Sequence, residues 1–442
     1  MPELNFKGKE FVYNHHLAVP HRPLVPDAEK SIGNARLDGN LIIQGDNLHA
    51  LKALLPMYAG KVDCIFIDPP YNTGNEGWCY NDNVNSPVVQ EWLKANPIGI
   101  EDGLRHDKWC AMMWPRLRLL HELLGEAGSL WVTLDDNEMH RARGMLDSIF
   151  GDDNFVATIC WENKVSPAND AKFFSDDFDY LIVYAKNKEV WRPNGLERTA
   201  SQQSYYSNPD EDERGPWNSA TCTCNKSRSE RPNLYYAIRN PHTGDEVYPS
   251  ETAVWRFSKD SYREVDAKKL LYWGARGDSR MPRLKRFLSE ATSVVPRTVW
   301  HYEDAGHTQA AMTELKNLMG KTPFQTPKPL QLLLRILHIA TTEHSIILDS
   351  FAGSGTTAHA VLAANKQDGG DRKFILVECE NYADTLTAER VRRVIHGYDF
   401  SGTQREELWR KSLTFTDLKQ STHGSLISRA SSSDSACPLN PW

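Results

Sequence analysis

The sequence predicts an α/β protein with a doubly wound parallel sheet, which both ends of the chain build and an inserted, partly β domain interrupts. Short apolar strands alternate with amphipathic helices near both ends, as in a parallel sheet covered by helices. The middle, roughly 190–310, is instead rich in Asn, Pro, Ser and aromatic residues, with short β-like pieces between turn signals. The 442 residues suffice for two or three domains.

The N-terminal part of the predicted sheet begins with a strand, helix, strand unit over 41–71. Its leucines recur on one face of the helix, and the run VDCIFI that follows predicts a buried strand. The next predicted elements are a helix over 107–127, a strand SLWVTL ending at Asp135 and Asp136, and a helix over 137–150. This alternation indicates parallel strands joined by helical crossovers.

The same alternation returns near the C-terminus, with a helix over 327–340, a strand over 345–349, a helix over 356–366, a strand over 373–378 and a helix over 382–397. The predicted domains are an N-terminal extension 1–39, a first half 40–189, an insertion 190–320, a second half 321–400 and a C-terminal tail 401–442. The last 22 residues contain seven serines and no periodicity, which predicts a partly disordered tail.

Composition excludes several classes of protein. No apolar run approaches the ~18 residues of a membrane span, and charges interrupt the N-terminal segment before a secretory signal could form, so we expect a cytoplasmic protein. The eight cysteines are scattered, which predicts reduced thiols rather than a disulfide framework. The net charge of -7 argues against coating nucleic acid by bulk charge, although a localised basic face remains open.

The cluster Asp68-Pro69-Pro70-Tyr71 directly follows the buried strand VDCIFI. Ligands bind at the carboxyl ends of strands in open α/β sheets, so the cluster lies at the edge of the sheet where a ligand is expected. A carboxylate and a proline carbonyl can accept the two N–H groups of an exocyclic amine, while a tyrosine ring stacks on a planar base. The alternative is a plain turn at the end of a strand.

A second cluster, Asp349-Ser350-Phe351-Ala352-Gly353-Ser354-Gly355-Thr356, joins another apolar strand to a helix. Its glycines let the backbone approach a ligand at the start of a helix. It lacks the third glycine of a dinucleotide fingerprint and the GK[ST] ending of a P-loop. Glu378 ends the next strand, near the ~20-residue spacing at which a carboxylate binds ribose hydroxyls. The pair of clusters favours a nucleoside cofactor without phosphates; a lone glycine loop could be only a tight turn.

Four motifs together resemble the amino-methylating DNA methyltransferases: DPPYNTG (68–74), FAGSGTT (351–357), TPKP (326–329) and GDNL (45–48). The order, with DPPY ahead of the glycine loop, is similar to their β-type arrangement and, within it, to the modification subunits of type III restriction systems. The resemblance covers roughly 40–400. The chain departs from the family by ending soon after 400, where many such subunits continue.

The resemblance implies a Rossmann-like methyltransferase sheet that binds S-adenosylmethionine. Asp68, Pro69, Pro70 and Tyr71 would form the catalytic pocket for the target amine. The cofactor would contact Asp46, Thr326, Lys328, Asp349, Phe351, Ala352, Gly353, Ser354, Gly355, Thr356 and Glu378. Within that set Glu378 would take the ribose, Asp46 would lie near the adenine, and Thr326 and Lys328 would lie near the carboxylate end. Asp46 could instead cap a helix, and Lys328 could be a solvated lysine at a helix start.

The implied reaction is methylation of the N6 amine of adenine in double-stranded DNA, by base flipping and direct transfer. Asp68 and Pro69 would draw the amine toward tetrahedral geometry, and no covalent nucleophile is needed; carbon-5 methylation would need a Pro-Cys, which the chain lacks. The implied partners are double-stranded DNA, a second copy in a homodimer, and a restriction (helicase-nuclease) subunit. The alternatives are methylation of the cytosine N4 amine, a catalytically silent DNA-binding subunit, and an RNA or protein methyltransferase.

The middle segment carries a concentration of basic residues. From Arg214 to Arg297 there are 16 Lys plus Arg and nine Asp plus Glu, a local balance of +7. Arg276, Arg280, Arg283, Lys285 and Arg286 are interleaved with Trp273 and Phe287, which favours DNA contact and target recognition. The alternative is a solvated, loop-rich surface. Cys222 and Cys224 could pair with His242 on a metal, but nothing else there has ligand spacing, and no metal is expected.

Overall fold

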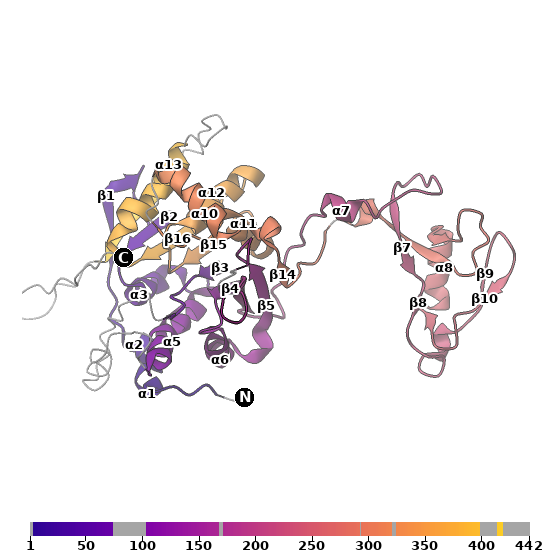
Figure 1. The fold of residues 1–442 in the computed structure, drawn as a ribbon, viewed down its shortest axis with the longest axis horizontal. Coiled ribbons are helices and arrows are strands. Elements are labelled where there is room, and N and C mark those ends of the chain that lie inside the picture. Colours follow the sequence, from indigo (N-terminus) through magenta and orange to yellow (C-terminus); the bar gives the residue numbers. More distant parts are fainter. Residues whose placement is uncertain are drawn as a thin grey trace, which may run out of the picture. The chain divides into compact units, whose positions relative to one another are not determined.

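The computed structural model describes residues 3–73, 103–167, 171–291, 293–320, 324–397 and 413–418. These divide into two compact units (Figure 1), a core unit within 1–192 and 297–442 and an insert unit, 193–296. The expected insertion, 190–320, therefore ends too late. Residues 297–320 belong to the core unit because β14 (Val299–Trp300) pairs with a strand of its sheet and α10 (Thr308–Met319) contacts one of its helices.

The core unit contains a ten-stranded sheet. In sheet order its strands are β1 (Leu24–Ile32), β17 (Leu413–Leu418), β2 (Asn40–Gln44), β16 (Lys373–Glu378), β15 (Ile346–Asp349), β3 (Val62–Ile67), β4 (Leu124–Leu134), β6 (Phe178–Ala185), β5 (Phe155–Glu162) and β14. The six strands from β17 to β4 are parallel, whereas β1 and β6 run antiparallel to their neighbours. Both ends of the chain contribute to this sheet, which confirms the predicted fold class.

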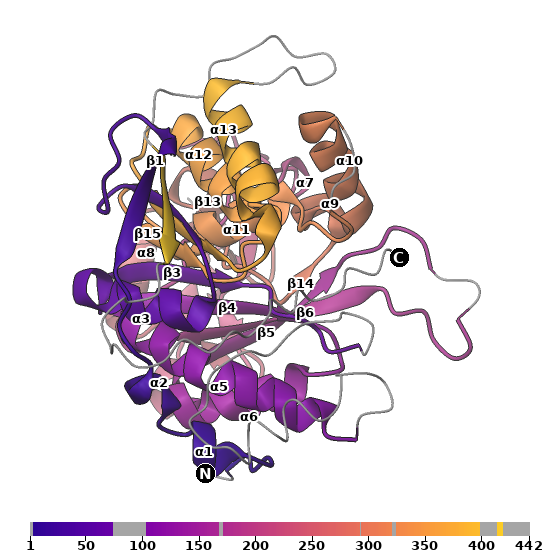
Figure 2. The ribbon, with the colours of Figure 1, turned by 90° about the vertical axis from the view of Figure 1, so that its left-hand side faces the viewer.

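Helices cover both faces of the sheet (Figures 1 and 2). One face carries α3 (Asn47–Tyr58), α5 (Arg105–Leu123) and α6 (Met139–Phe150), and the other carries α10, α11 (Leu330–Ala340), α12 (Thr356–Asp368) and α13 (Glu389–His396). The central strands read as continuous apolar runs because both of their faces are covered; in β3, Val62, Ile65 and Ile67 are fully buried. No helix within the described residues is long and apolar enough to cross a membrane.

The order of strands creates a switch point between β3 and β15. The chain leaves β3 through α5 to β4 on one side, and it leaves β15 through α12 to β16 on the other. Leu348 pairs with Ile65, and the Ile346 backbone N–H donates to the Asp63 carboxylate at 2.7 Å. The loops after β3 and β15 therefore leave the same edge of the sheet side by side, where open α/β sheets bind ligands.

The expected helix over 107–127 stops earlier, because β4 begins at Leu124 rather than Ser129. The pairing between β3 and β4 shifts register after Val62 and Leu124, so the strand starts in the stretch assigned to the helix. The expected helix over 382–397 is also divided into η4 (Asn381–Ala383), the π-helical turn η5 (Asp384–Ala388) and α13.

Both predicted terminal segments contribute to the core unit. Within 1–39, α1 (Lys9–Val12), α2 (His15–Ala18) and β1 are formed, and Phe6, Val12 and Val19 are buried in the main hydrophobic core. Within the predicted tail 401–442, residues 413–418 form β17 between β1 and β2. The remainder of that tail, whose disorder was predicted, lies outside the described residues.

The insert unit is built from short antiparallel pieces around an aromatic core. Its strands are β7 (Trp217–Thr221), β8 (Thr223–Cys224), β9 (Ile238–Arg239), β10 (Glu246–Val247), β11 (Val254–Trp255), β12 (Leu271–Tyr272) and β13 (Arg283–Phe287), with helices α7 (Ala200–Gln203) and α8 (Lys259–Ala267). Strands β12, β13 and β7 form a three-stranded sheet. Cys222, Tyr236, Trp255 and Trp273 pack together in the core. The partly β character expected of this segment agrees with these strands.

Candidate active site

Asp68 directly follows β3, and two side chains fix its carboxylate. The Thr133 hydroxyl, at the end of the neighbouring strand β4, donates to Asp68 Oδ1 at 2.6 Å. Lys328 Nζ lies 2.7 Å from Asp68 Oδ2. Thr133 is fully buried and the side chain of Lys328 is 12% exposed, which restricts the rotamers of the carboxylate between them. The sequence analysis did not identify Thr133, although its place at the end of the strand SLWVTL was a usable signal.

Tyr71 lies beside the same lysine and is held at its hydroxyl. Its O–H donates to Asp179 Oδ2 at 3.1 Å, and Lys328 Nζ lies 5.0 Å from the centre of its ring. Burial, followed by the nearby charges of Asp68 and Asp179, raises the pKa of Tyr71 well above its ordinary value. Burial also raises the pKa of Asp179. The phenol therefore stays neutral and serves as a fixed, hydrogen-bonded ring rather than as a base.

Pro70 makes a contact that holds the loop, and its place in the catalytic pocket stays a prediction. The Trp109 indole N–H donates to the Pro70 carbonyl at 2.7 Å. This carbonyl is therefore engaged in holding the loop, which leaves the Pro69 carbonyl as the candidate acceptor for a target amine. Trp109 is fully buried in α5, so the anchor of the loop is part of the hydrophobic core.

The loop leaves Tyr71 through a strained residue. Asn72 has φ 61°, a left-handed conformation that costs a non-glycine residue roughly 1–3 kcal/mol. Its side-chain amide donates to the Arg105 carbonyl at 3.2 Å and to Glu138 Oε1 at 2.5 Å, which holds it there. Burial raises the pKa of Glu138, whose carboxylate also contacts His106 Nδ1 at 2.5 Å. Gly74, the last residue of the DPPYNTG motif, lies outside the described residues.

The glycine loop adopts a conformation that side chains at its glycines would disturb. Gly353 has φ 51° and Gly355 has φ 79°. A Cβ at Gly355 would lie 3.0 Å from the Thr387 carbonyl oxygen, and one at Gly353 would lie 3.2 Å from the ring of Phe324. Both requirements select glycine. Gly355 caps α12, so the loop exposes the positive end of that helix dipole to its surroundings.

The remaining predicted loop residues support this conformation. Ala352 is buried and its backbone N–H donates to the Val377 carbonyl at 3.1 Å, while Phe351 packs against the main core. Arg390, on α13, donates to the hydroxyls of Ser354 and Thr356 at 3.1 and 2.8 Å. Ser354 and Thr356 are thus engaged within the protein through their side chains. The sequence analysis did not identify Arg390, which lies too far along the chain for a motif to reveal.

Asp349 ends β15 inside the protein. Its Oδ1 accepts the Phe351 backbone N–H at 3.0 Å, and its Oδ2 accepts the Thr357 hydroxyl at 2.5 Å. Burial raises the pKa of Asp349 to about 7, an effect that these two hydrogen bonds oppose and that the charges of Asp68 and Glu378 reinforce. The carboxylate therefore holds the glycine loop in its conformation through these two hydrogen bonds, from the buried side of the loop.

Glu378 ends the next strand and reaches the glycine loop. Its Oε2 accepts the Gly353 backbone N–H at 2.7 Å, and its Oε1 accepts the Glu380 backbone N–H at 3.0 Å. Burial raises its pKa. Each oxygen has a second lone pair, so the carboxylate still has acceptor capacity for a ligand hydroxyl.

Asp46 and Lys328 have contacts other than those that the resemblance implied. The Asp46 carboxylate caps α3 by accepting the backbone N–H groups of Leu48 and His49 at 2.9 and 3.4 Å, as the alternative interpretation expected. It also accepts from Arg116 at 3.2 Å. Lys328 pairs with the target-side carboxylate Asp68. Thr326 is exposed and lies shortly before α11.

The residues around the glycine loop fit a nucleoside cofactor such as S-adenosylmethionine. Two glycines leave the backbone of the loop without side chains at these positions. The Ser350 hydroxyl oxygen is buried with no hydrogen-bond partner among the described residues. Glu378 adds an acceptor for hydroxyls at the same edge.

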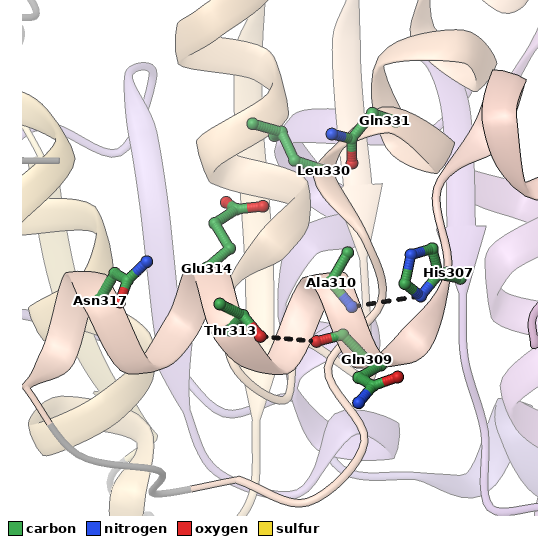
Figure 3. A pocket seen from close by; sticks show the side chains of 8 residues that line it. All are labelled: His307, Gln309, Ala310, Thr313, Glu314, Asn317, Leu330 and Gln331. Atoms are coloured by element: carbon green, nitrogen blue, oxygen red, sulfur yellow. Dashed lines mark hydrogen bonds between the residues drawn. The ribbon is translucent and has the colours of Figure 1, made fainter. Parts of the chain in front are cut away.

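A hollow of about 580 Å³ lies elsewhere on the core unit, between α10 and the start of α11 (Figure 3). It is lined by His307, Gln309, Ala310, Thr313, Glu314, Asn317, Leu330 and Gln331. None of the predicted site residues lines it. The Glu314 carboxylate accepts a hydrogen bond from Arg390 at 3.2 Å and pairs with His359 at 3.3 Å. It therefore helps to hold Arg390, the residue that contacts the glycine loop.

In the insert unit the expected DNA-contacting residues separate into two groups. Arg276, Arg280, Arg283 and Arg286 are exposed. Lys285 is buried and pairs with Asp210 at 2.5 Å and Asp212 at 2.6 Å, which argues against its predicted contact with DNA. The interleaved aromatic residues Trp273 and Phe287 are 3% and 1% exposed. The alternation of β13 points Phe287 inward, and Trp273 packs in the aromatic core of the insert unit.

Known proteins that are similar to this chain include two Mod subunits and a type II methyltransferase. The chain is 30% identical to the Mod subunit of the type III restriction-modification enzyme StyLTI from Salmonella typhimurium, over 89% of the chain and 62% of that subunit. It is 31% identical to the EcoPI Mod subunit of Escherichia phage P1, over 94% of the chain and 69% of the subunit. It is 30% identical to the type II methyltransferase M.KpnI of Klebsiella pneumoniae, over 82% of the chain and 85% of that protein.

The chain thus spans less than two thirds of the length of the Salmonella subunit. A sequence model described as DNA methylase matches residues 62–389. That range begins at β3, includes the loops after β3 and β15, and ends at the start of α13. It therefore contains both clusters around which the site is built. The chain belongs to the DNA methylase family.

Proposed function

We propose that the protein is a DNA methyltransferase that transfers a methyl group from S-adenosylmethionine to the N6 amine of adenine in double-stranded DNA, at a specific site. The observation that carries the proposal is the fixed Asp68 carboxylate at the switch point of the sheet, beside the ring of Tyr71 and next to the glycine loop. A restriction-modification system is its proposed setting, because two of the relatives are named as Mod subunits.

The target amine would bind between the loop carbonyl of Pro69 and the carboxylate of Asp68. Both groups accept hydrogen bonds, and together they favour a tetrahedral nitrogen whose lone pair is no longer delocalised into the base. Thr133 donates to Oδ1 of Asp68, which orients the carboxylate for this task. Tyr71, fixed through its hydroxyl, would stack on the base. The amine is held within the duplex by pairing, so the base must be flipped to reach Asp68.

Lys328 adds a feature to this pocket. Its ammonium is within hydrogen-bond distance of Asp68 and over the ring of Tyr71, two groups that the flipped base is proposed to contact. The incoming amine would approach the same carboxylate, where Thr133 donates to Oδ1 and Lys328 contacts Oδ2. Each carboxylate oxygen has a second lone pair, so the amine can share Oδ2 with Lys328 or take its place.

The cofactor would be held by the backbone of Gly353 and Gly355, by Ser350 and by the Glu378 carboxylate. When bound, S-adenosylmethionine would supply an electrophilic methyl group on its sulfonium. Asp68 and Pro69 would then orient the amine for direct attack, so that catalysis depends on positioning and electrostatics rather than on a covalent enzyme intermediate.

The further partners are proposed from the relatives and the insert unit. The exposed arginines of the insert unit, Arg276, Arg280, Arg283 and Arg286, are proposed to contact DNA and to take part in target recognition. A homodimer and a restriction subunit are proposed as protein partners, since Mod subunits belong to type III restriction-modification enzymes by name.

The test is methyl transfer to DNA with radiolabelled S-adenosylmethionine, followed by nucleoside analysis. Labelled N6-methyl-2′-deoxyadenosine from wild-type protein is the expected product, and Asp68→Asn should transfer nothing while binding the cofactor normally. Asp153→Asn, an exposed carboxylate outside the pocket, is the matched control. Labelled N4-methylcytosine would replace the adenine assignment by the cytosine one. Cofactor binding without transfer to any DNA would instead indicate a silent DNA-binding subunit.

A further inference from the structure

Two adjacent phenylalanines lie almost completely in solvent. Phe173 is 82% and Phe174 is 92% exposed, the highest values among the large hydrophobic side chains that the structure describes. Val165, on the same connection between β5 and β6, and Phe178, the first residue of β6, are also exposed. Exposed apolar groups gathered in one place mark a surface that binds something.

This connection leaves the sheet at the edge that carries Asp68. β5 runs in the same direction as β4 and β3, because β6 is antiparallel to both β4 and β5. The end of β5 therefore lies at the carboxyl edge, where the loop after β3 also begins. The base of the connection is closed by the Asn163 backbone N–H, which donates to the Asp177 carbonyl at 3.1 Å, and by Lys164, which donates to the Asp176 carbonyl.

The same connection contacts the proposed base pocket directly. Asp179, the second residue of β6, accepts the hydroxyl of Tyr71 at 3.1 Å. Asn163, at the start of the connection, is also hydrogen-bonded to Asp179. The stem that supports the two phenylalanines is therefore fixed to the ring proposed to stack on the target base.

A double-stranded DNA substrate is the partner that this placement favours. A flipped base leaves a gap in the duplex, and proteins that distort DNA insert apolar wedges such as Phe between base steps. Lys172 Nζ lies 5.4 Å from the ring centre of Phe173, which puts a positive charge beside the rings for a neighbouring phosphate. A protein bound over these rings would instead cover the edge through which the target base must reach Asp68.

We propose that Phe173 and Phe174 insert into the base stack next to the target and keep the duplex open while the base occupies the pocket. The proposal rests on the proposed function. The rings contribute to extrusion of the base and not to the transfer itself. Their contribution is therefore needed only when the target base is paired and stacked.

The test compares the double variant Phe173→Ala/Phe174→Ala with wild type on two DNA duplexes. Both duplexes carry the target site, identified beforehand by sequencing DNA that the wild-type protein has methylated. One duplex has the target base normally paired, and the other has it opposite an abasic position, where extrusion costs less. The double variant should methylate the paired duplex 10- to 100-fold more slowly in single turnover, and the abasic duplex within threefold of wild type. Phe11→Ala, an exposed ring on α1, is the control and should match wild type on both.

A second measurement uses 2-aminopurine at the target position, whose fluorescence rises when the base leaves the stack. Wild type and a Phe173→Leu/Phe174→Leu variant, which keeps two apolar wedges, should give the rise, and the alanine variant should not. Equal loss on both duplexes, or no loss on either, would overturn the wedge while leaving methyl transfer established. The proposal would also be overturned if the alanine variant had a different oligomeric mass in solution from wild type, while the ratio of its methylation rates on the two duplexes matched that of wild type. That result would indicate a protein interface. Absence of transfer by wild type on both duplexes would refute the proposed function and the wedge with it.

Discussion

The buried carboxylate of Asp349 should make the core unit less stable as the pH rises, and Asp349→Asn should remove this effect. Burial raises the pKa of Asp349 from 3.8 to about 7 in the folded protein. The folded state therefore keeps a proton between about pH 4 and pH 7 that the unfolded chain has lost, so the free energy of unfolding falls as the pH rises through this window. At 1.36 kcal/mol for each pKa unit, the total penalty is about 4 kcal/mol.

The asparagine variant keeps an acceptor for the Phe351 backbone N–H and can donate to the Thr357 hydroxyl, but it carries no charge. Its free energy of unfolding relative to wild type should rise by about 1.4 kcal/mol for each pH unit within the window and become constant above pH 7. The measurement is urea unfolding from pH 4 to pH 8, followed by hydrogen exchange in peptides from β15 and β16. Asp153→Asn is the control for a generic loss of charge. A stability difference that does not change with pH, or one that grows toward low pH, would refute the reasoning.

Three further changes test the loop and the insert unit. Gly355→Ala should destabilise the core unit by roughly 1–2 kcal/mol, seen as a lower Tm, since alanine is strained at φ 79° and its Cβ would meet a backbone carbonyl at 3.0 Å; an unchanged Tm would contradict this. Glu378→Gln should weaken S-adenosylmethionine binding by about 1.5–3 kcal/mol in calorimetric titration without DNA, and unchanged affinity would put the ribose acceptor elsewhere. Lys285→Met should destabilise the insert unit by roughly 1.5–3 kcal/mol in proteolysis assays, because it removes the buried ammonium that Asp210 and Asp212 share; a folded variant whose salt dependence of DNA binding has weakened would instead make Lys285 a phosphate contact.

The two clusters at the strand ends could be predicted because their signals are local. A buried apolar run followed by prolines or glycines indicates a strand that ends in a turn, and a periodic helix follows each of them. Asp68 and Asp349 occupy such positions. The expected helix and strand boundaries near Leu124 were wrong, because the register shift between β3 and β4 depends on pairing that the local pattern does not contain.

The groups that hold the site could not be predicted in this way. Thr133 lies 65 residues from Asp68, and Asp179 lies 108 residues from Tyr71, so each contact depends on which strands are neighbours. In the insert unit the strands are two to five residues long, too short for alternation to separate inward from outward side chains. Lys285 was therefore assigned to DNA contact on composition alone, although it is buried.

The pairing of Lys328 with Asp68 also links the two parts of the proposed site. Lys328 precedes α11 by two positions, and α11 contacts both β3 and α12. β3 presents the target-side carboxylate, whereas α12 begins at the glycine loop on the cofactor side. A shift of α11 that moves Lys328 away from Asp68 therefore also acts on the helix that supports the glycine loop. A flipped base that moves Lys328 away from Asp68 should therefore alter the cofactor loop through α11, without any change in the pairing of β3 with β15.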